Sequence, residues 1–130
     1  MFALTRQIQI TCDQAKNSTG RLIGRDPPKF EDNETTVEQL QARISKTLDY
    51  LAGIDAAAFE GAEDRQITIE LPGDLVLEMD GGQLLRDWAL PNFYFHLVTA
   101  YDILRKEGAE IGKKDYLARV GPFIRQRAPA

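Results

Sequence analysis

The segment with the richest chemistry in this chain is residues 90–105, which contains the only histidine, His96. Four aromatic residues share the segment, namely Phe93, Tyr94, Phe95 and Tyr101. Imidazole titrates near neutral pH, so a histidine can act as an acid, a base or a metal ligand. The segment therefore predicts where a site would lie, and its single histidine limits what that site can be.

A helix over about residues 92–107 must position His96. At about 100° per residue, Phe93, Leu97 and Ala100 share one face, which we expect to be the core stripe. His96 flanks this stripe, so it either hydrogen-bonds a neighbouring helix as a structural residue or contacts a ligand in a cleft. The aromatic residues fit a core or a ligand cage, and their helical spacing favours the core. The candidate ligand-binding residues are His96, Tyr94, Asn92, Trp88 and Tyr101.

The spacing of donor residues argues against a metal centre or a nucleophilic site. Two metal ligands on one helix must lie about one turn apart, but Asn92 and Ala100 occupy those positions relative to His96. No transition metal is expected, and His96 is the only conceivable ligand. Cys12 is interpreted as a small buried apolar residue, and Asp13 as a carboxylate on a helix surface. The catalytic residues and the cofactor stay unknown.

Composition limits the partners and the compartment. The 130 residues are the size of one domain, and the net charge of −4 lacks the basic bias of a nucleic-acid-binding protein. The single cysteine excludes an internal disulfide and favours a reducing compartment. No apolar run approaches the ~18 residues needed to cross a bilayer. We therefore expect a cytoplasmic protein with no membrane or nucleic-acid partner.

Periodicity predicts a mainly α-helical bundle with one inserted β-hairpin. Helical spacing covers residues 4–23, 36–53, 83–90 and 92–107, and a capping box at Thr36 and Gln39, or at Thr35 and Glu38, begins the second helix. Between the first two helices, two prolines make residues 25–34 a loop, which Phe30 is expected to pin to the body. Residues 67–71 and 75–79 alternate with a period of two around Pro72-Gly73-Asp74, which is typical of a hairpin.

Four segments resemble an uncharacterised bacterial domain-of-unknown-function family in the DinB/YfiT-like superfamily of metalloenzymes. They are Met1-Phe2 with Arg6-Gln7-Ile8-Gln9 and Asp13-Gln14-Ala15-Lys16; Pro28-Lys29-Phe30-Glu31-Asp32 with Glu34-Thr35-Thr36; Leu90-Pro91-Asn92-Phe93-Tyr94-Phe95-His96 with Ala100-Tyr101; and Gly112-Lys113-Lys114-Asp115-Tyr116-Leu117. The resemblance implies an up-and-down helical bundle over residues 1–117, followed by a C-terminal tail over residues 118–130.

The resemblance also shapes the expected function. Characterised superfamily relatives hold a divalent metal with a histidine triad, and only His96 is available here. We therefore expect a small-molecule-binding protein; the alternatives are a metal-dependent transferase-like enzyme that uses His96, or a homodimeric interaction module. Family members begin with an additional helix before Met1. Its absence would leave an apolar groove for a partner, a second copy or the tail, so a homodimer is an expected partner.

Overall fold

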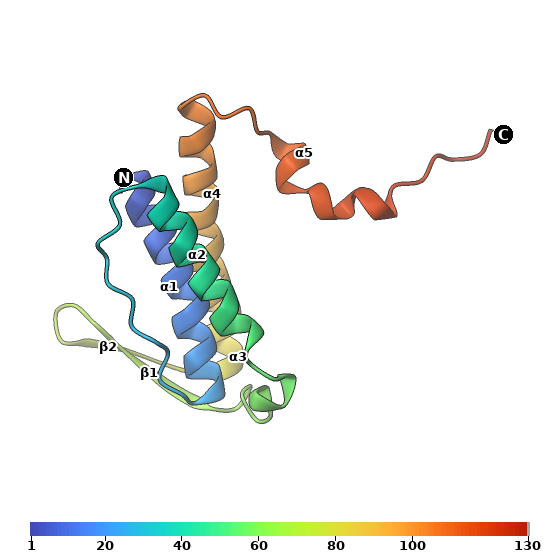
Figure 1. Ribbon diagram of the computed structural model, residues 1–130. Coiled ribbons are helices and arrows are strands. Elements are labelled where there is room, and N and C mark those ends of the chain that lie inside the picture. The colour runs from blue at the N-terminus through green and yellow to red at the C-terminus, as the bar shows by residue number, and fades with distance from the viewer. Residues whose placement is uncertain (130) are drawn as a thin grey trace.

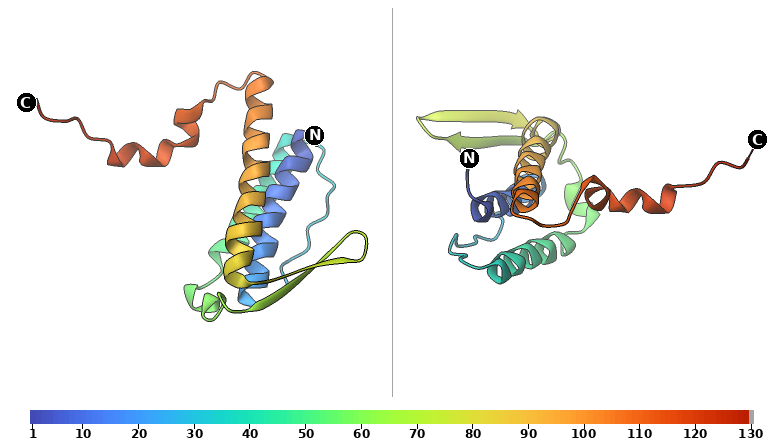
Figure 2. Two further views of the ribbon diagram at one scale, coloured as in Figure 1. Left: turned by 180° about the vertical axis from the view of Figure 1, so that it is seen from behind. Right: turned by 90° about the horizontal axis from the view of Figure 1, so that it is seen from above.

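The computed structural model describes residues 1–129, and three long helices make up its body (Figure 1). They are α1 (Leu4–Ile23), α2 (Val37–Ala52) and α4 (Leu90–Lys106). α1 packs against both α2 and α4, so it is the central helix. α1 and α2 run in the same direction, and α4 runs opposite to both (Figures 1 and 2). The predicted helical bundle with a hairpin is confirmed.

The ends of the first two helices follow from local chemistry. Gly24 adopts a left-handed φ of 66° and ends α1 at Ile23, where the predicted helix also ends. Thr36 accepts a hydrogen bond from the Gln39 backbone N–H, and the capping box predicted for this pair begins α2. Because the two helices are parallel, the segment between them must return along the whole bundle (Figure 1). The irregular loop of residues 25–36 therefore lies beside α1 and α2.

The hairpin closes the lower end of the bundle. β1 (Gln66–Leu71) pairs with antiparallel β2 (Leu75–Asp80), and Gly73 and Asp74 in the predicted turn have positive φ. Ile67 and Ile69 of β1 are buried in a cluster with Leu22, Ala62 and Leu84, with Trp88 packed against it. A short 3₁₀ turn, Ala56–Phe59, connects α2 to the hairpin and is capped by Asp55.

Pro91 lies inside one continuous helix. α3 (Gly81–Gln83) leads through a π-helical segment, Leu84–Ala89, into α4, and the Leu90 N–H donates to the Leu85 carbonyl five residues earlier. Pro91 has no N–H to donate, which favours such a widened turn. The Asn92 side chain then donates to the Trp88 carbonyl at 3.0 Å. Pro91 therefore marks a distortion within a longer helix and not the start of a separate one.

The C-terminal segment leaves the body. α5 (Lys113–Tyr116) and a 3₁₀ turn, Ala118–Phe123, form what we call the arm, residues 113–129. The arm and the hairpin point to opposite sides of the helices (Figures 1 and 2). Tyr101 donates to the Gly112 carbonyl at 2.7 Å, and its ring packs against Tyr116, which fixes the root of the arm to α4. Among residues 1–129, no helix is long and apolar enough to cross a membrane.

Candidate functional site

His96 is tied to the central helix by a buried glutamine. Its Nδ1 lies 2.7 Å from Oε1 of Gln7, which is 2% exposed. The Gln7 amide nitrogen donates to the Phe2 carbonyl, so Oε1 is the acceptor and His96 Nδ1 donates. Burial, and secondarily the charge of Arg6, lowers the pKa of His96. The imidazole is therefore neutral at pH 7, with an unprotonated Nε2.

The other candidate residues are spread along α4 and the turn before it. Asn92 and Trp88 are joined by the hydrogen bond described above, and Trp88 packs against the hairpin core. Tyr94 is half exposed, whereas Tyr101 holds the arm. The structure thus brings Asn92 and Trp88 together and leaves His96, Tyr94 and Tyr101 in separate surroundings. Gln7, the partner of His96, was not among the predicted site residues.

The donor set around His96 does not fit the histidine triad of the superfamily. In the part of the chain that the structure describes, no group of three His, Cys, Asp or Glu side chains could hold a metal ion. The Nδ1 of His96 is already occupied by Gln7. Cys12 is free and buried, and burial raises the pKa of its thiol although Thr47 and Arg43 oppose that rise. We derive no reaction step through a metal, and the expected lack of one stays a prediction.

Arg43 of α2 is the centre of a buried ion-pair network. Its side chain is 1% exposed, and its guanidinium lies 2.9 Å from Asp13, 3.0 Å from Asp32 and 2.9 Å from Glu34. It also donates to the Glu31 backbone carbonyl. Burial alone would lower the pKa of Arg43, but Glu34 and Asp13 outweigh burial and raise it. Asp13 was predicted to be a surface carboxylate; its side chain stays 28% exposed while it pairs with Arg43, so it is only partly covered.

A second ring of contacts completes this network. Gln9 donates to Glu34 at 2.8 Å, and Arg6 pairs with Asp32 at 2.6 Å. The Phe30 ring lies 5.0 Å from the Lys16 ammonium and 5.6 Å from the Arg43 guanidinium, which confirms that Phe30 pins the loop. We call this set the Arg43 network: Arg6, Gln9, Asp13, Lys16, Phe30, Asp32, Glu34 and Arg43. Its three cations are matched by three carboxylates, so its charges are internally balanced.

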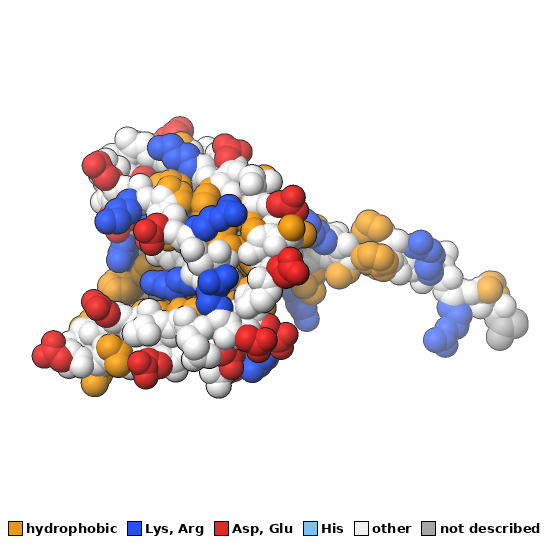
Figure 3. All heavy atoms as spheres, turned by 90° about the horizontal axis from the view of Figure 1, so that it is seen from below, with side chains coloured by type: hydrophobic (Ala, Val, Ile, Leu, Met, Phe, Trp, Pro, Cys, Tyr) orange, Lys and Arg blue, Asp and Glu red, His pale blue; other side chains and the backbone are white. Residues whose placement is uncertain are grey.

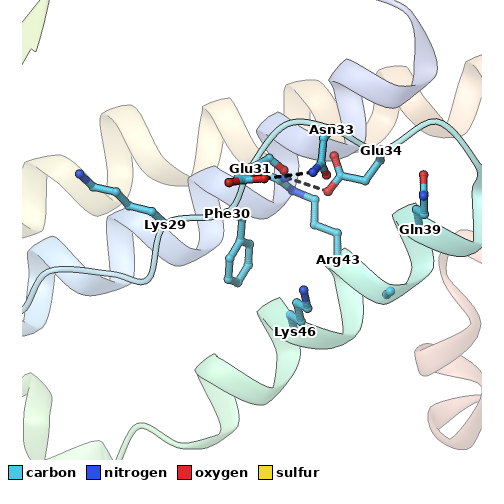
Figure 4. A pocket seen from close by; sticks show the side chains of 9 residues that line it. Lys29, Phe30, Glu31, Asn33, Glu34, Gln39, Arg43 and Lys46 are labelled. Carbon is cyan, nitrogen blue, oxygen red and sulfur yellow. Dashed lines mark hydrogen bonds and ion pairs between the residues drawn. The ribbon is translucent and has the colours of Figure 1, made fainter.

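A cavity of about 380 Å³ lies between the loop and α2 (Figure 4). Phe30 and Arg43 face it, with Glu34 beside the guanidinium and Lys46 one turn further along α2 (Figure 4). The charged atoms of Arg43 and Glu34 are already paired with each other. Its cations without an ion pair among residues 1–129 are Lys46 and Lys29, and Lys29 also lines the hollow described next.

A larger hollow of about 930 Å³ lies on the other side of Phe30, at the C-terminal end of α1. We call it the cationic hollow; its charged lining residues are Lys16, Arg21, Arg25, Lys29, Arg65, Asp13 and Asp26. Seen from below, basic side chains gather in the middle of this end of the molecule, with acidic ones around them (Figure 3). Arg65 donates through Nε to the Leu22 carbonyl, which ties β1 to the end of α1.

The charges of the cationic hollow are not balanced. Among residues 1–129, Arg21, Arg25, Lys29 and Arg65 make no ion pair, and Asp26 is the only lining carboxylate outside the Arg43 network. Four unpaired cations less one carboxylate leave a net charge of +3 in a chain of net charge −4. Arg21 is partly buried, and burial lowers the pKa of its guanidinium.

The comparisons with known proteins identify the family. The sequence matches the family described as Domain of unknown function (DUF1993) over residues 1–117. The chain belongs to DUF1993. It is also similar to the crystal structure of a DinB family member from Shewanella denitrificans, with 42% identity and a TM-score of 0.82 over 99% of this chain and 70% of that chain. No curated protein matches.

The DUF1993 segments that carried the resemblance meet in space. Arg6 and Gln9 contact Asp32 and Glu34 of the second segment, and Gln7 contacts His96 of the third. The sequence separates these residues by 25 positions or more, so only the fold shows their pairing. The cationic hollow was missed altogether. Its basic residues recur at positions 21, 25 and 29, but Gly24 and Pro27 break the helix there, so the spacing indicated no shared face.

Proposed function

We propose that this DUF1993 protein binds a small, multiply charged anion in the cationic hollow. The observation that carries the proposal is Arg21, a partly buried guanidinium that lines the hollow and makes no hydrogen bond or ion pair among residues 1–129. A partly buried arginine with free donors can bind a carboxylate or phosphate group, because its planar donors match both in geometry. The bound anion would supply the partner that the chain itself does not.

The volume of the hollow and the positions of its exposed cations suit such a ligand. Its volume of about 930 Å³ lies within the range of small-molecule sites. Arg25 and Lys29 are exposed at its edge, where they can attract an anion and then contact it. Lys16 and Asp13 form the wall next to the Arg43 network and are paired with each other at 3.6 Å. The charges of the hollow are thus paired on the Lys16 side, whereas Arg25 and Lys29 make no ion pair among residues 1–129.

Isothermal titration calorimetry tests this proposal with three probes: inorganic phosphate, pyrophosphate and citrate. Pyrophosphate and citrate distinguish phosphate from carboxylate recognition at comparable charge. We expect at least one of the two to bind, and Arg21→Gln to weaken binding by about 10- to 100-fold, since a charge-assisted hydrogen bond contributes about 1.5–3 kcal/mol. Lys29→Gln should weaken binding less, because Lys29 is exposed.

The matched control is Arg105→Gln. Arg105 is an exposed arginine on α4, outside the hollow, where it lies 3.5 Å from Asp102. Arg105→Gln removes the same charge from the chain as Arg21→Gln does. An equal loss of affinity in the two variants would therefore indicate general electrostatic attraction. The proposal would be overturned by that result, or by the absence of binding of all three probes to the unaltered protein.

The His96 site supports a binding function less well. Its Nδ1 is held by Gln7, and its pKa is lowered, so Nε2 is a neutral acceptor. A metal-dependent transferase-like enzyme would need further ligands from outside residues 1–129. The sequence led us to expect a small-molecule site at the His96 segment; we propose instead that the site lies at the C-terminal end of α1.

A further inference from the structure

Two glycines at the C-terminal end of α1, Gly20 and Gly24, line the cationic hollow. Neither has a side chain, so other parts of the chain come close to the backbone there. A Cβ atom on Gly20 would lie 2.8 Å from the Arg25 carbonyl oxygen and 3.0 Å from the Pro27 ring. The Arg25 backbone N–H also donates to the Gly20 carbonyl at 2.9 Å. The loop therefore packs directly on α1 at Gly20, which fixes the backbone of Arg25 at the hollow.

Gly24 makes the same kind of room for the side chain of Arg65. A Cβ atom on Gly24 would lie 2.7 Å from Nη1 and 2.9 Å from Cζ of Arg65, closer than real Cβ contacts come. The Arg65 guanidinium therefore lies against the bare backbone of Gly24. Its Nε donates to the Leu22 carbonyl at 3.1 Å, which is one of the carbonyls that the end of α1 leaves without a helical partner.

These two contacts hold the guanidinium of Arg65 and leave its outer donors free. Arg65 lines the hollow, and its Nη atoms make no hydrogen bond or ion pair among residues 1–129. A long exposed side chain loses conformational freedom when it binds a ligand, and that loss weakens binding. Because the folded chain already holds this guanidinium, Arg65 can contact a ligand at a smaller loss than an unsupported arginine can.

The position of Arg65 also offsets an electrostatic cost at this end of the helix. The carbonyls at a helix C-terminus carry partial negative charge, which disfavours an anion. The cationic hollow lies at the C-terminal end of α1. The guanidinium of Arg65 is bonded to the Leu22 carbonyl, so it compensates this negative charge where it arises.

We propose that Arg65 is the pre-positioned anion-binding arginine of the cationic hollow, and that Gly24 is the positioning residue that gives its guanidinium room. The inference rests on the proposed function, because it concerns the same site. It also narrows the ligand class. A ligand that pairs with Arg21 of α1 and with Arg65 before β1 carries at least two negative charges, as pyrophosphate and citrate do.

Isothermal titration calorimetry tests the role of Arg65 with whichever of phosphate, pyrophosphate and citrate binds most tightly. We expect Arg65→Gln to weaken binding by about 10-fold or more, because a hydrogen bond to a charged group is lost. Arg65→Lys should weaken binding nearly as much. An ammonium group keeps the charge, but it cannot contact the Leu22 carbonyl and still present two coplanar donors to the anion. Full affinity in either variant would overturn the assignment of Arg65.

Gly24→Ala tests the positioning role. The added Cβ displaces the end of a flexible side chain, so we expect affinity to fall about 3- to 10-fold as Arg65 loses its fixed position. The effect should vanish where Arg65 is already absent, so Gly24→Ala combined with Arg65→Gln should bind as Arg65→Gln alone does. A further loss of affinity in the double variant would overturn the positioning role, because Gly24 would then act independently of Arg65.

The matched control for backbone strain is Gly108→Ala. Gly108 follows α4 with a positive φ of 98°, and a Cβ atom there would meet nothing within 4 Å. Gly108→Ala should therefore keep the affinity of the unaltered protein. Gly24→Asn is a second variant in case Gly24→Ala does not fold, since asparagine tolerates a left-handed φ better and adds the same Cβ. Circular dichroism checks that each variant is folded.

Arg21→Gln separates the failure of this inference from the failure of the proposed function. If a probe binds and Arg21→Gln weakens it, while Arg65→Gln and Gly24→Ala bind as the unaltered protein does, the anion site stands and the roles of Arg65 and Gly24 are overturned. If none of the three probes binds the unaltered protein, both proposals are overturned.

Discussion

The Arg43 network and the cationic hollow are neighbouring regions that differ in how their cations are paired. Both include side chains of α1, and Phe30 lies between them. In the network, Arg43 is 1% exposed and every cation has a carboxylate within 4 Å. In the hollow, Arg21, Arg25, Lys29 and Arg65 have no carboxylate within 4 Å among residues 1–129. The charges of the network therefore pair with one another, whereas these four cations of the hollow are available to a ligand.

This difference separates a structural role from a binding role. Removing one member of a buried ion pair leaves its partners desolvated and unpaired, which is strongly destabilising. Removing an unpaired cation at an open hollow leaves nothing uncompensated. Stability and anion binding should therefore respond to different arginines, and variants of Arg43 and Arg21 measure the contrast directly.

The largest expected effect is that of Arg43→Met. Methionine retains much of the apolar volume but leaves Asp13, Asp32 and Glu34 without their shared cation. We expect the free energy of unfolding to fall by about 3–5 kcal/mol in urea titrations at pH 7. Arg105→Met, at an exposed pair on α4, should change it by less than about 1 kcal/mol. Similar values for the two variants would contradict a structural network.

Glu34→Gln should have a smaller effect that disappears in acid. Burial would raise the pKa of Glu34, but hydrogen bonds from Gln9 and Arg43 outweigh burial and lower it below its usual 4.5. Because the folded state then binds a proton less readily than the unfolded state, stability falls as the pH drops below about 4.5. We expect a loss of about 1–3 kcal/mol at pH 7, since a buried charged hydrogen bond is removed.

The pH dependence provides the control for Glu34→Gln. Glutamine resembles a protonated glutamate, so the unaltered protein and the variant should approach equal stability once the pH is below the folded pKa of Glu34. Urea titrations from pH 7 down to pH 3 follow this convergence. Two curves that stay parallel over that range would show that Glu34 does not titrate as the network requires.

Local patterns in the sequence were enough to predict most of the fold. Gly24, the capping box at Thr36 and the Pro72-Gly73-Asp74 turn each act over a few residues, and each lies where it was expected. Helical spacing likewise indicated α1, α2 and α4. These signals are local because hydrogen bonds within a helix, a cap or a tight turn join residues that are close in sequence.

The site could not be predicted in the same way, because its contacts are long-range. Asp13 and Arg43 are 30 residues apart, and Gln7 and His96 are 89 apart. A polar residue on a helix gives no sign of whether solvent or another chain segment faces it, so Asp13 was assigned to the surface. The prolines indicated a loop, but nothing in the sequence indicated that Asp32 and Glu34 of that loop pair with Arg43.

The titration of His96 should change the free energy of unfolding less than that of Glu34 does, and at a higher pH. Its pKa is lowered by burial and by Arg6, so the unfolded chain binds the proton more readily. Stability should therefore be greatest above about pH 6.5 and decline as the pH falls from there through the lower pKa of the folded state. As the only histidine, His96 gives one imidazole NMR signal, whose titration reports this pKa directly.

The variant Arg6→Gln sharpens the His96 measurement. It removes the positive charge that opposes protonation of His96, so the NMR midpoint should move upward while the Gln7 hydrogen bond is retained. Arg6 also pairs with exposed Asp32, and the loss of that pair should cost less than about 1 kcal/mol. A midpoint at or above 6.5 in the unaltered protein would contradict the lowered pKa of this partly buried imidazole.

Arg21→Gln should change stability least and ligand response most. Because Arg21 makes no ion pair within residues 1–129, the free energy of unfolding of Arg21→Gln should stay within about 0.5 kcal/mol of that of the unaltered protein. A ligand present at 100 times its dissociation constant stabilises a folded protein by about 2.7 kcal/mol. Pyrophosphate or citrate should therefore raise the melting temperature of the unaltered protein and of Arg105→Gln, but not that of Arg21→Gln. If Arg21→Gln were as destabilising as Arg43→Met, Arg21 would be a structural residue, and the distinction between the two regions would fail.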